Sequence, residues 1–259
     1  MTPPTSADLL AAVKQSPVAA AAHDRARWVS LFTADGVVED PVGAAPHRGR
    51  DAIGRFYDTF IGPRDIVFHP QADIVCGNAV IRDVLLEVRM GDGVTMMVPA
   101  ILRYGVHVDG ADLTIAQLQA FWELPPMLWQ FARCGLRAAP VAVALTRSLV
   151  SNQQVSGALG FLTGLHRPAR RHRGEIDTLV TALIGGDQLT TRRMLSGASQ
   201  VTLGDLAPLG VDALVAHLRG AQQSSRITAG ATTAVSLRGD DGPAVLLIEA
   251  DPWTVRCYL

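Results

Sequence analysis

The stretch LFTADGVVEDPVGAAPHRGRDAIGRFY, Leu31–Tyr57, decides the fold, because a strand, a tight loop and a helix are predicted within it. A short apolar run predicts a strand that stops at Glu39, Asp40 and Pro41. The Pro- and Gly-rich residues after it predict a loop, and a helix is expected from about Arg50 to Phe60. Taken alone, an Asp-Pro step at the end of a strand is ordinary turn chemistry, in which Asp40 accepts hydrogen bonds from the following loop.

The sequence on either side predicts an α+β domain. Two helices are expected before the stretch, over residues 6–15 and 23–32, and Pro17 should end or kink the first of them. Strands are expected over residues 65–76, 79–90, 95–108 and 113–123, separated by Gly-Asn and Gly-Asp-Gly turns. Helices followed by antiparallel strands indicate a curved sheet covered on one face by three helices.

The same order of elements recurs in a shorter form near the C-terminus. APHRGRDAIGRFY (45–57) matches LAPLGVDALVAHL (206–218) through a Gly-X-Asp-Ala-hydrophobic turn that opens a helix in both. Three strand-like runs follow the second turn, and the first of them covers residues 226–239. We therefore expect a first domain over residues 1–125, a helical bridge and basic linker over 126–173, and a second domain of the same fold class over 174–259.

Composition excludes several classes of protein. The net charge of -1 and the pI near 6.6 disfavour a surface tuned to nucleic acid. No signal peptide or membrane span is recognised, and Cys76, Cys134 and Cys257 lack metal-ligand spacing, so a reduced, cytoplasmic protein is expected. The basic segment 166–174 is interpreted as a solvated linker in preference to an anion-binding patch. No nucleotide fingerprint, metal cluster or nucleophile elbow is present, so no cofactor and no metal are expected.

The opening stretch resembles the segment of bacterial ketosteroid isomerases in which an acidic-Asp-Pro-X-Gly motif ends the first strand. LLEVRM, ILRY and QAFWE match the same family at the right distances, and the resemblance covers about residues 5–124. The wider group is the SnoaL-like or nuclear transport factor 2-like superfamily. It implies a cone-shaped α+β fold around an apolar pocket, here present as two tandem copies.

The resemblance implies that Asp40 is the proton-shuttling base of an isomerase acting on a hydrophobic polycyclic or steroid-like ketone. It also implies two hydrogen-bond donors for the enolate oxygen, a tyrosine and a protonated aspartic acid. Ser16 and Ala100 stand at those two positions, so both donors are missing. Ser16 and Tyr57 are the candidate substrate-binding replacements. Tyr104, His69 and His107 are further conceivable donors. For Tyr57 and Tyr104 a packed ring with its hydroxyl reaching water is favoured, and for His69 and His107 surface or structural roles.

Two other functions remain open. An epoxide hydrolase or polyketide cyclase needs a second acid across the pocket, and the available acids are Glu39, Asp73, Asp83 and Glu87. Strand alternation turns Glu39 away from the face that carries Asp40. A non-catalytic ligand-binding or partner-binding module needs no second acid. In each case we expect a hydrophobic small-molecule ligand. We also expect either a homodimer or a monomer with intramolecular domain pairing, in which the second copy covers the open sheet of the first as a dimer partner would.

Overall fold

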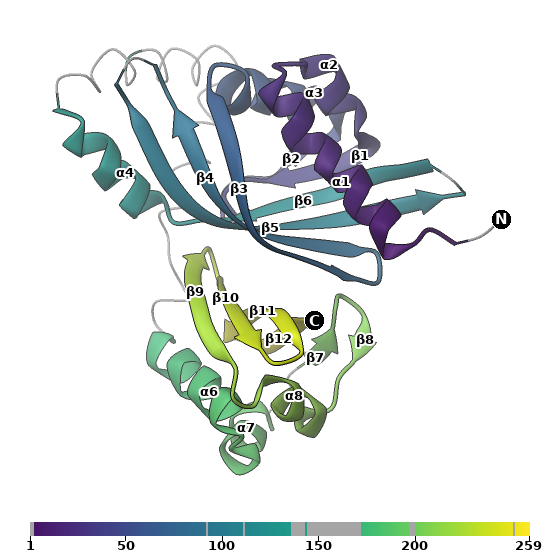
Figure 1. The fold of residues 1–259 in the computed structure, drawn as a ribbon, viewed down its shortest axis with the longest axis vertical. Helices are drawn as coiled ribbons and strands as arrows, with labels where there is room; N and C mark the ends of the chain where they lie inside the picture. The colour runs from purple at the N-terminus through teal and green to yellow at the C-terminus, as the bar shows by residue number, and fades with distance from the viewer. Residues whose placement is uncertain are drawn as a thin grey trace.

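Two units with the same topology make up the molecule. The computed structural model describes residues 3–91, 93–110, 112–135, 143, 172–196, 200–250 and 252–259. Each unit is built on a six-stranded mixed sheet, with strand order β2-β1-β6-β5-β4-β3 in the first and β8-β7-β12-β11-β10-β9 in the second. Both sheets remain open at their edges. The predicted α+β class with two tandem copies is therefore confirmed (Figure 1).

Three helices cover one face of the first sheet (Figure 1). They are α1 (Ser6–Ala21), α2 (Arg25–Ser30) and α3 (Gly49–Phe56), and α3 continues as the π-helix η1 (Tyr57–Ile61). The predicted end at Pro17 is wrong, because α1 runs through the proline to Ala21. Burial of Val13 before the proline and of Ala19 and Ala20 after it keeps both parts of the helix on the core. This packing outweighs the roughly 3 kcal/mol that an interior proline costs.

The strands of the first unit follow the sequence patterns closely. They are β1 (Phe32–Glu39), β2 (His47–Arg48), β3 (Asp65–Cys76), β4 (Ala79–Arg89), β5 (Thr95–Asp109) and β6 (Asp112–Phe121). β1 and β6 are parallel neighbours, with Glu39 opposite Gln119, and the other pairs in the sheet are antiparallel. The C-terminal ends of β1 and β6 therefore lie side by side at one edge of the helix-covered face.

The second unit repeats this order. Its helices are α6 (Arg173–Gly185), α7 (Gln188–Leu195) and α8 (Val211–Leu218), and its strands are β7 (Gln200–Leu203), β8 (Ala207–Pro208), β9 (Gln222–Ala229), β10 (Thr232–Gly239), β11 (Gly242–Ala250) and β12 (Trp253–Tyr258). The run 226–239, predicted as one strand, is part of a hairpin that turns at Gly230, where φ is +57°. The run therefore contributes to two strands, β9 and β10, where one was predicted.

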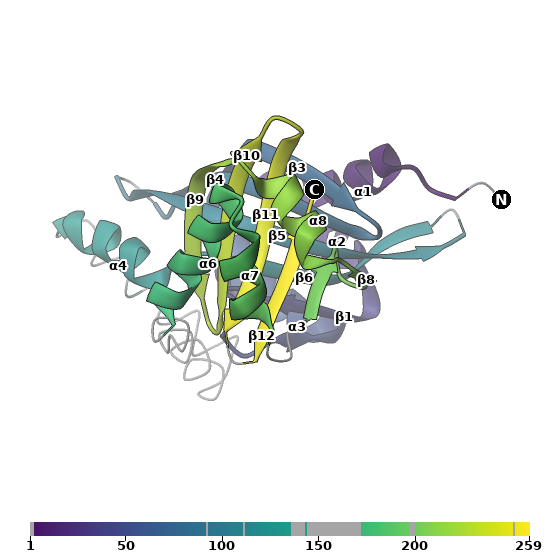
Figure 2. The same cartoon turned by 90° about the horizontal axis from the view of Figure 1, so that it is seen from below.

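The two sheets pack face to face, so each unit covers the sheet of the other (Figure 2). Strands of the two sheets run across one another in this view, and α6, α7 and α8 cover the outer face of the second sheet. The apolar contact contains side chains from both units: Ile74, Ala79, Ile81, Ile101, Phe121, Ile227, Ala229, Ala234, Val245, Leu247 and Tyr258. The opposite face of the first sheet packs against helices α1, α2 and α3 and forms a separate hydrophobic core.

A buried ion pair crosses this interface. Arg103 on β5 is 6% exposed and binds both carboxylate oxygens of Asp205 in the second unit. The Tyr258 hydroxyl donates to the same carboxylate at 2.6 Å. Burial opposes ionisation of Asp205, but the hydrogen bonds from Arg103 and Tyr258 outweigh it and hold the pKa of that carboxyl below its usual value. Arg103 also donates to Gln117 and Gln119 on β6, which extends the network across the first sheet.

The second unit also contacts the loop that follows β1. Gly43, with φ of +94°, packs directly on Gly230, and a Cβ added at Gly43 would lie 2.6 Å from the Gly230 Cα. Glu123, just after β6, accepts a hydrogen bond from the Thr228 amide at 3.2 Å. The loop beyond β1 and the segment beyond β6 are therefore both fixed against the second sheet.

The bridge between the units is described only in part. Helix α4 (Leu124–Arg133) follows the first sheet, and Gln130 exchanges two hydrogen bonds with the Met97 backbone on β5. The rest of the predicted helical bridge and most of the basic segment 166–174 lie outside the described residues. Among the helices that the model describes, none combines the length and the apolar character needed to cross a bilayer.

Candidate functional site

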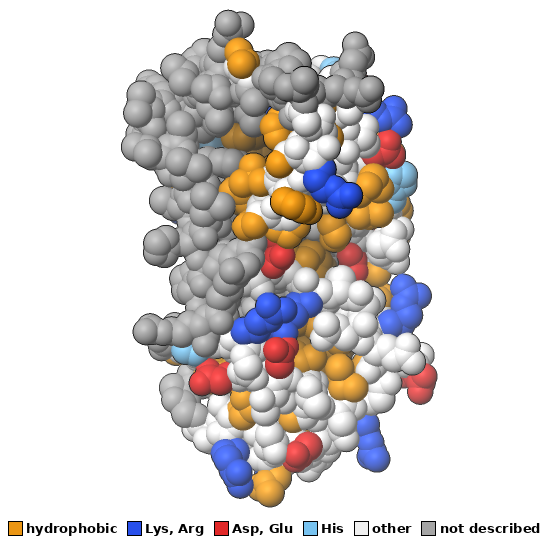
Figure 3. All heavy atoms as spheres, turned by 90° about the vertical axis from the view of Figure 1, so that its left-hand side faces the viewer, with side chains coloured by type: hydrophobic (Ala, Val, Ile, Leu, Met, Phe, Trp, Pro, Cys, Tyr) orange, Lys and Arg blue, Asp and Glu red, His pale blue; other side chains and the backbone are white. Residues whose placement is uncertain are grey.

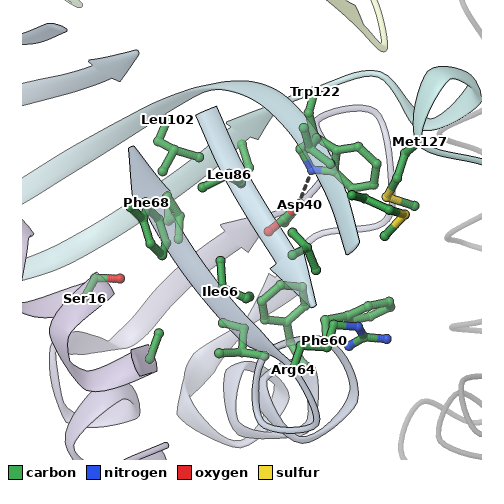
Figure 4. Close-up of a pocket in the computed structure, with 18 of the residues that line it drawn as sticks. Ser16, Asp40, Phe60, Arg64, Ile66, Phe68, Leu86, Leu102, Trp122 and Met127 are labelled. Atoms are coloured by element: carbon green, nitrogen blue, oxygen red, sulfur yellow. Dashed lines mark hydrogen bonds between the residues drawn. The ribbon is translucent and has the colours of Figure 1, made fainter. Parts of the chain in front are cut away.

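A deep cavity lies between the helices and the sheet of the first unit. Its volume is about 190 Å³, more than ten times the roughly 10–15 Å³ that one water requires on the same measure. The polar side chains in its wall are Ser16, Asp40, Arg64 and Tyr104, together with the indoles of Trp28 and Trp122. All other described side chains in the wall are apolar, including Phe68, Leu86 and Leu102 (Figure 4). The cavity is thus suited to an apolar molecule with few polar groups.

Apolar side chains of α4 (Leu124–Arg133) extend from the cavity wall to the surface. Met127 and Leu128 of α4 line the cavity, and on the outer side of the same helix Trp129 is 66% exposed. Figure 3 shows apolar side chains gathered on the part of this face that belongs to the first unit. Helix α4 thus carries apolar side chains both in the cavity wall and on the surface.

Asp40 reaches the cavity because the strand before it ends there. Parallel pairing of β1 and β6 brings Asp40 and Trp122 together just beyond the ends of two neighbouring strands. The Val42 amide donates to the Ala120 carbonyl at 2.9 Å, which holds the loop against β6. The Asp40–Pro41 peptide bond is cis. The carboxylate points inward beside the Trp122 indole (Figure 4).

The environment of Asp40 makes it a weak acid. Burial among apolar side chains raises its pKa to about 6, although a 2.6 Å hydrogen bond from the Trp122 indole nitrogen acts in the opposite direction. A carboxyl with this pKa is ionised at neutral pH and still basic enough to accept a proton from carbon. Among the described wall residues Asp40 is the only acid.

The other acids considered for this site lie elsewhere. Glu39 accepts a hydrogen bond from Gln119, on the face turned toward the second unit. Asp73 pairs with Lys14 and Arg82, and Glu87 pairs with His69 and Arg89. Asp83 is 8% exposed and is absent from the described cavity wall.

A hydrogen-bonded chain of three side chains occupies another part of the wall. The Trp28 indole nitrogen donates to the Ser16 hydroxyl at 3.1 Å. The Ser16 hydroxyl lies near the Tyr104 hydroxyl and acts to lower its pKa, but burial dominates and raises the pKa of Tyr104 to about 12, with the charge of Asp40 acting in the same direction as burial. Because an indole N–H can only donate, Ser16 accepts from Trp28 and can donate its own proton to Tyr104. The Tyr104 proton is then free to point into the cavity.

The expectation that the Tyr104 hydroxyl reaches water at the surface is wrong, because Tyr104 is 1% exposed and lines the cavity. Tyr57 is absent from the described wall. Its ring packs on Trp28 with centroids 5.4 Å apart, and its hydroxyl is buried without a partner in the described structure. His107 is exposed, and His69 pairs with Glu87. Ala100 is buried in the core and offers no donor.

The sequence analysis did not identify Trp122 or Arg64 as site residues, and for Tyr104 it favoured a packed ring over a role in the site. The aromatic residues occupy strand positions at which a core ring is the ordinary interpretation, and Arg64 follows a Gly-Pro turn typical of solvent-exposed arginine. A usable signal was the period of two along β5, which places Tyr104 on the same face as Val98 and Leu102.

Metal binding is not indicated by the described part of the chain, where no group of three His, Cys, Asp or Glu side chains converges. The three cysteines are unpaired with one another.

Fold and site together define a small α+β domain built around an apolar cavity with one inward carboxylate. Residues 13–111 match the family model of the SnoaL-like domain. This part of the chain is therefore a SnoaL-like domain of the nuclear transport factor 2-like superfamily. The likeness of the second unit rests on its identical order of elements and strands.

Several solved structures resemble part of the chain. RV0760c from Mycobacterium tuberculosis is 24% identical, with 48% of this chain and 96% of that one covered and a TM-score of 0.43. The Delta 5-3-ketosteroid isomerase from Mycobacterium sp. is 29% identical, with 46% and 95% covered and a TM-score of 0.41. The epoxide hydrolase/cyclase-like enzyme SalBIII is 19% identical, with 45% and 92% covered and a TM-score of 0.40. No curated protein matches the chain.

Proposed function

We propose that the cavity catalyses an isomerase-like proton transfer on a hydrophobic polycyclic or steroid-like ketone, with Asp40 as the general base. The observation that carries this proposal is the placement of Asp40, a carboxyl with a pKa of about 6 in an otherwise apolar wall. Asp40 takes a proton from the carbon between the carbonyl and the double bond, which leaves a dienolate. It returns the proton to the far end of the conjugated system, and the product is the conjugated ketone.

Tyr104 supplies the hydrogen bond that the developing oxyanion needs. Its own proton is free because Ser16 donates to its oxygen, and Ser16 is held in turn by Trp28. A chain of hydrogen bonds of this kind polarises each member and strengthens the last donor. Tyr104 thus replaces one of the two donors that the resemblance led us to expect, and Ser16 supports it without donating to the oxyanion itself.

Substitution of Tyr104 tests this role. Tyr104→Phe should lower kcat by about 100- to 1000-fold with little change in KM, because the lost hydrogen bond is strongest in the transition state. Tyr57→Phe is the matched control, and it should leave kcat within about twofold because the Tyr57 hydroxyl has no described partner. Steady-state isomerisation of a β,γ-unsaturated 3-ketosteroid measures both variants. Equal losses in the two would remove Tyr104 from the mechanism.

The pH dependence should report ionisation of the base. Since Asp40 acts as a carboxylate, kcat/KM should rise with pH, reach half its maximum near pH 6 and then stay level. Trp122→Phe removes a hydrogen bond that favours the carboxylate, so the midpoint should move to higher pH. A midpoint near pH 4 in the unmodified protein, or one that Trp122→Phe leaves in place, would contradict this assignment.

A binding module without catalysis is the second candidate. The apolar cavity wall suits such a module as well as it suits an isomerase. It predicts that Asp40 substitutions change ligand affinity and that no turnover occurs. An epoxide hydrolase or polyketide cyclase is less well supported, because none of its four candidate second acids lies in the described cavity wall.

A further inference from the structure

Arg64 is a buried cation that the proposed proton transfer does not use. It lies between η1 and β3, lines the cavity and is 9% exposed. Its Nη1 donates to the Thr59 carbonyl at 2.7 Å, and its guanidinium carbon lies 5.8 Å from the centroid of the Phe60 ring. No carboxylate pairs with it among the residues that the structure describes.

A guanidinium in this position is costly for the free protein. A buried charge normally has a counter-ion, since desolvation without one is strongly unfavourable. Burial without an acid partner accordingly lowers the pKa of Arg64 to about 10. Its bond to Thr59 uses one of five N–H donors, so the side chain retains capacity for an acceptor within the cavity.

The arrangement of the polar groups indicates where such an acceptor lies on the ligand. In Figure 4, Ser16 is on one side of Asp40 and Arg64 is on the other, next to Phe60. A ketone oxygen held at the Ser16 end therefore leaves the opposite end of an elongated ligand near Arg64. Planar anions fit this guanidinium best, because a carboxylate can accept two parallel N–H bonds.

We propose that the cavity binds a hydrophobic anion, an apolar ketone whose carboxylate or comparable acidic group pairs with Arg64. This inference builds on the proposed function, because it assigns the far end of the same substrate. The anion supplies the missing counter-ion, so a ligand without an acidic group leaves Arg64 unpaired and binds more weakly.

Two fluorescent probes that differ in one group test the pairing. 8-Anilinonaphthalene-1-sulfonate carries an anionic group, and N-phenyl-1-naphthylamine is the same aromatic skeleton without it. The unmodified protein should bind the sulfonate at least about tenfold more tightly, as expected for a hydrogen-bonded charge. Arg64→Gln should bring the ratio of the two dissociation constants to within about threefold, whereas Arg64→Lys, which keeps the charge but lacks the planar pair of donors, should retain only part of the preference.

Arg89→Gln is the matched control, because the Arg89 side chain is 55% exposed and pairs with Glu87 outside the cavity. It should leave the ratio unchanged. Equal affinities in the unmodified protein, no binding of the sulfonate, or a preference that survives Arg64→Gln would each overturn the inference. Binding is measured without turnover, so the two proposals fail separately: a preference without catalysis removes only the isomerase, and catalysis without a preference removes only the anion site.

Discussion

Asp40→Asn should lower kcat for isomerisation of a β,γ-unsaturated 3-ketosteroid by about 1000-fold, within the range attributed to general acid–base catalysis. The asparagine side chain keeps the size and polarity of the aspartate but cannot accept the proton. KM should change little, because the ketone is held mainly by the apolar wall. Absorbance of the conjugated product measures the rate directly.

The same substitution should make the protein more stable at neutral pH. The pKa of Asp40 is raised from 3.8 to about 6 on folding, so its contribution favours the folded state below pH 4 and is lost as the pH rises through 6. Above pH 6 the folded state buries a charge, at a cost of about 3 kcal/mol by linkage. Asp40→Asn removes that cost and should raise the free energy of unfolding by about 1 to 3 kcal/mol at pH 8, with little change at pH 4.

Glu39→Gln is the control for both effects, because Glu39 is the neighbouring carboxylate and binds Gln119 on the other face of the sheet. It should keep kcat within about threefold and should not stabilise the protein. Equal losses of activity in the two variants would show that the loop matters for its structure and that Asp40 has no special role as a base.

Among the substitutions considered for their effect on stability, Asp205→Ala should lower the free energy of unfolding the most. It leaves Arg103 buried between the sheets without its counter-ion and removes the acceptor of the Tyr258 hydroxyl. The expected decrease in the free energy of unfolding is about 3 kcal/mol, at the lower end of the range for a broken buried pair because the Asp205 side chain is 28% exposed. Urea denaturation at pH 7, followed by circular dichroism, measures the change.

Asp212→Ala provides the comparison. Asp212 binds Arg192 with the same two-oxygen geometry, but both side chains are more than half exposed. Loss of this surface pair should cost less than about 1 kcal/mol. If the two aspartate variants were equally stable, the contact between the sheets would contribute far less to folding than its burial indicates.

Much of the fold is predictable because its signals are local. Alternating apolar residues and Gly-containing turns located the four long strands of the first unit, and the Gly-X-Asp-Ala turn located the start of a helix in each unit. The hairpin at Gly230 was missed because its turn residues, Gly and Ala, lack the Asn-Gly or Asp-Gly signature. The helix through Pro17 was missed because tertiary packing, which sequence periodicity does not report, holds it together.

The site was predictable only where one short motif specifies it. The Asp-Pro-X-Gly sequence indicated Asp40 through its resemblance to the ketosteroid isomerase motif, whereas an Asp-Pro step alone would have indicated only a turn. Tyr104 and Trp122 come from separate strands, and their approach to Asp40 depends on the parallel register of β1 and β6 and on the bulge between Gly105 and Val106. Such long-range register cannot be obtained from the alternation within one strand.

The most direct test of the central claim is the rate at which the unmodified protein isomerises a β,γ-unsaturated 3-ketosteroid, followed by absorbance of the conjugated product between pH 4.5 and 8.5. Proton transfer by Asp40 predicts turnover well above the buffer rate, with kcat/KM half-maximal near pH 6. A steroid that binds in the cavity and is converted no faster than in buffer across this range would contradict the account and leave the protein as a ligand-binding module.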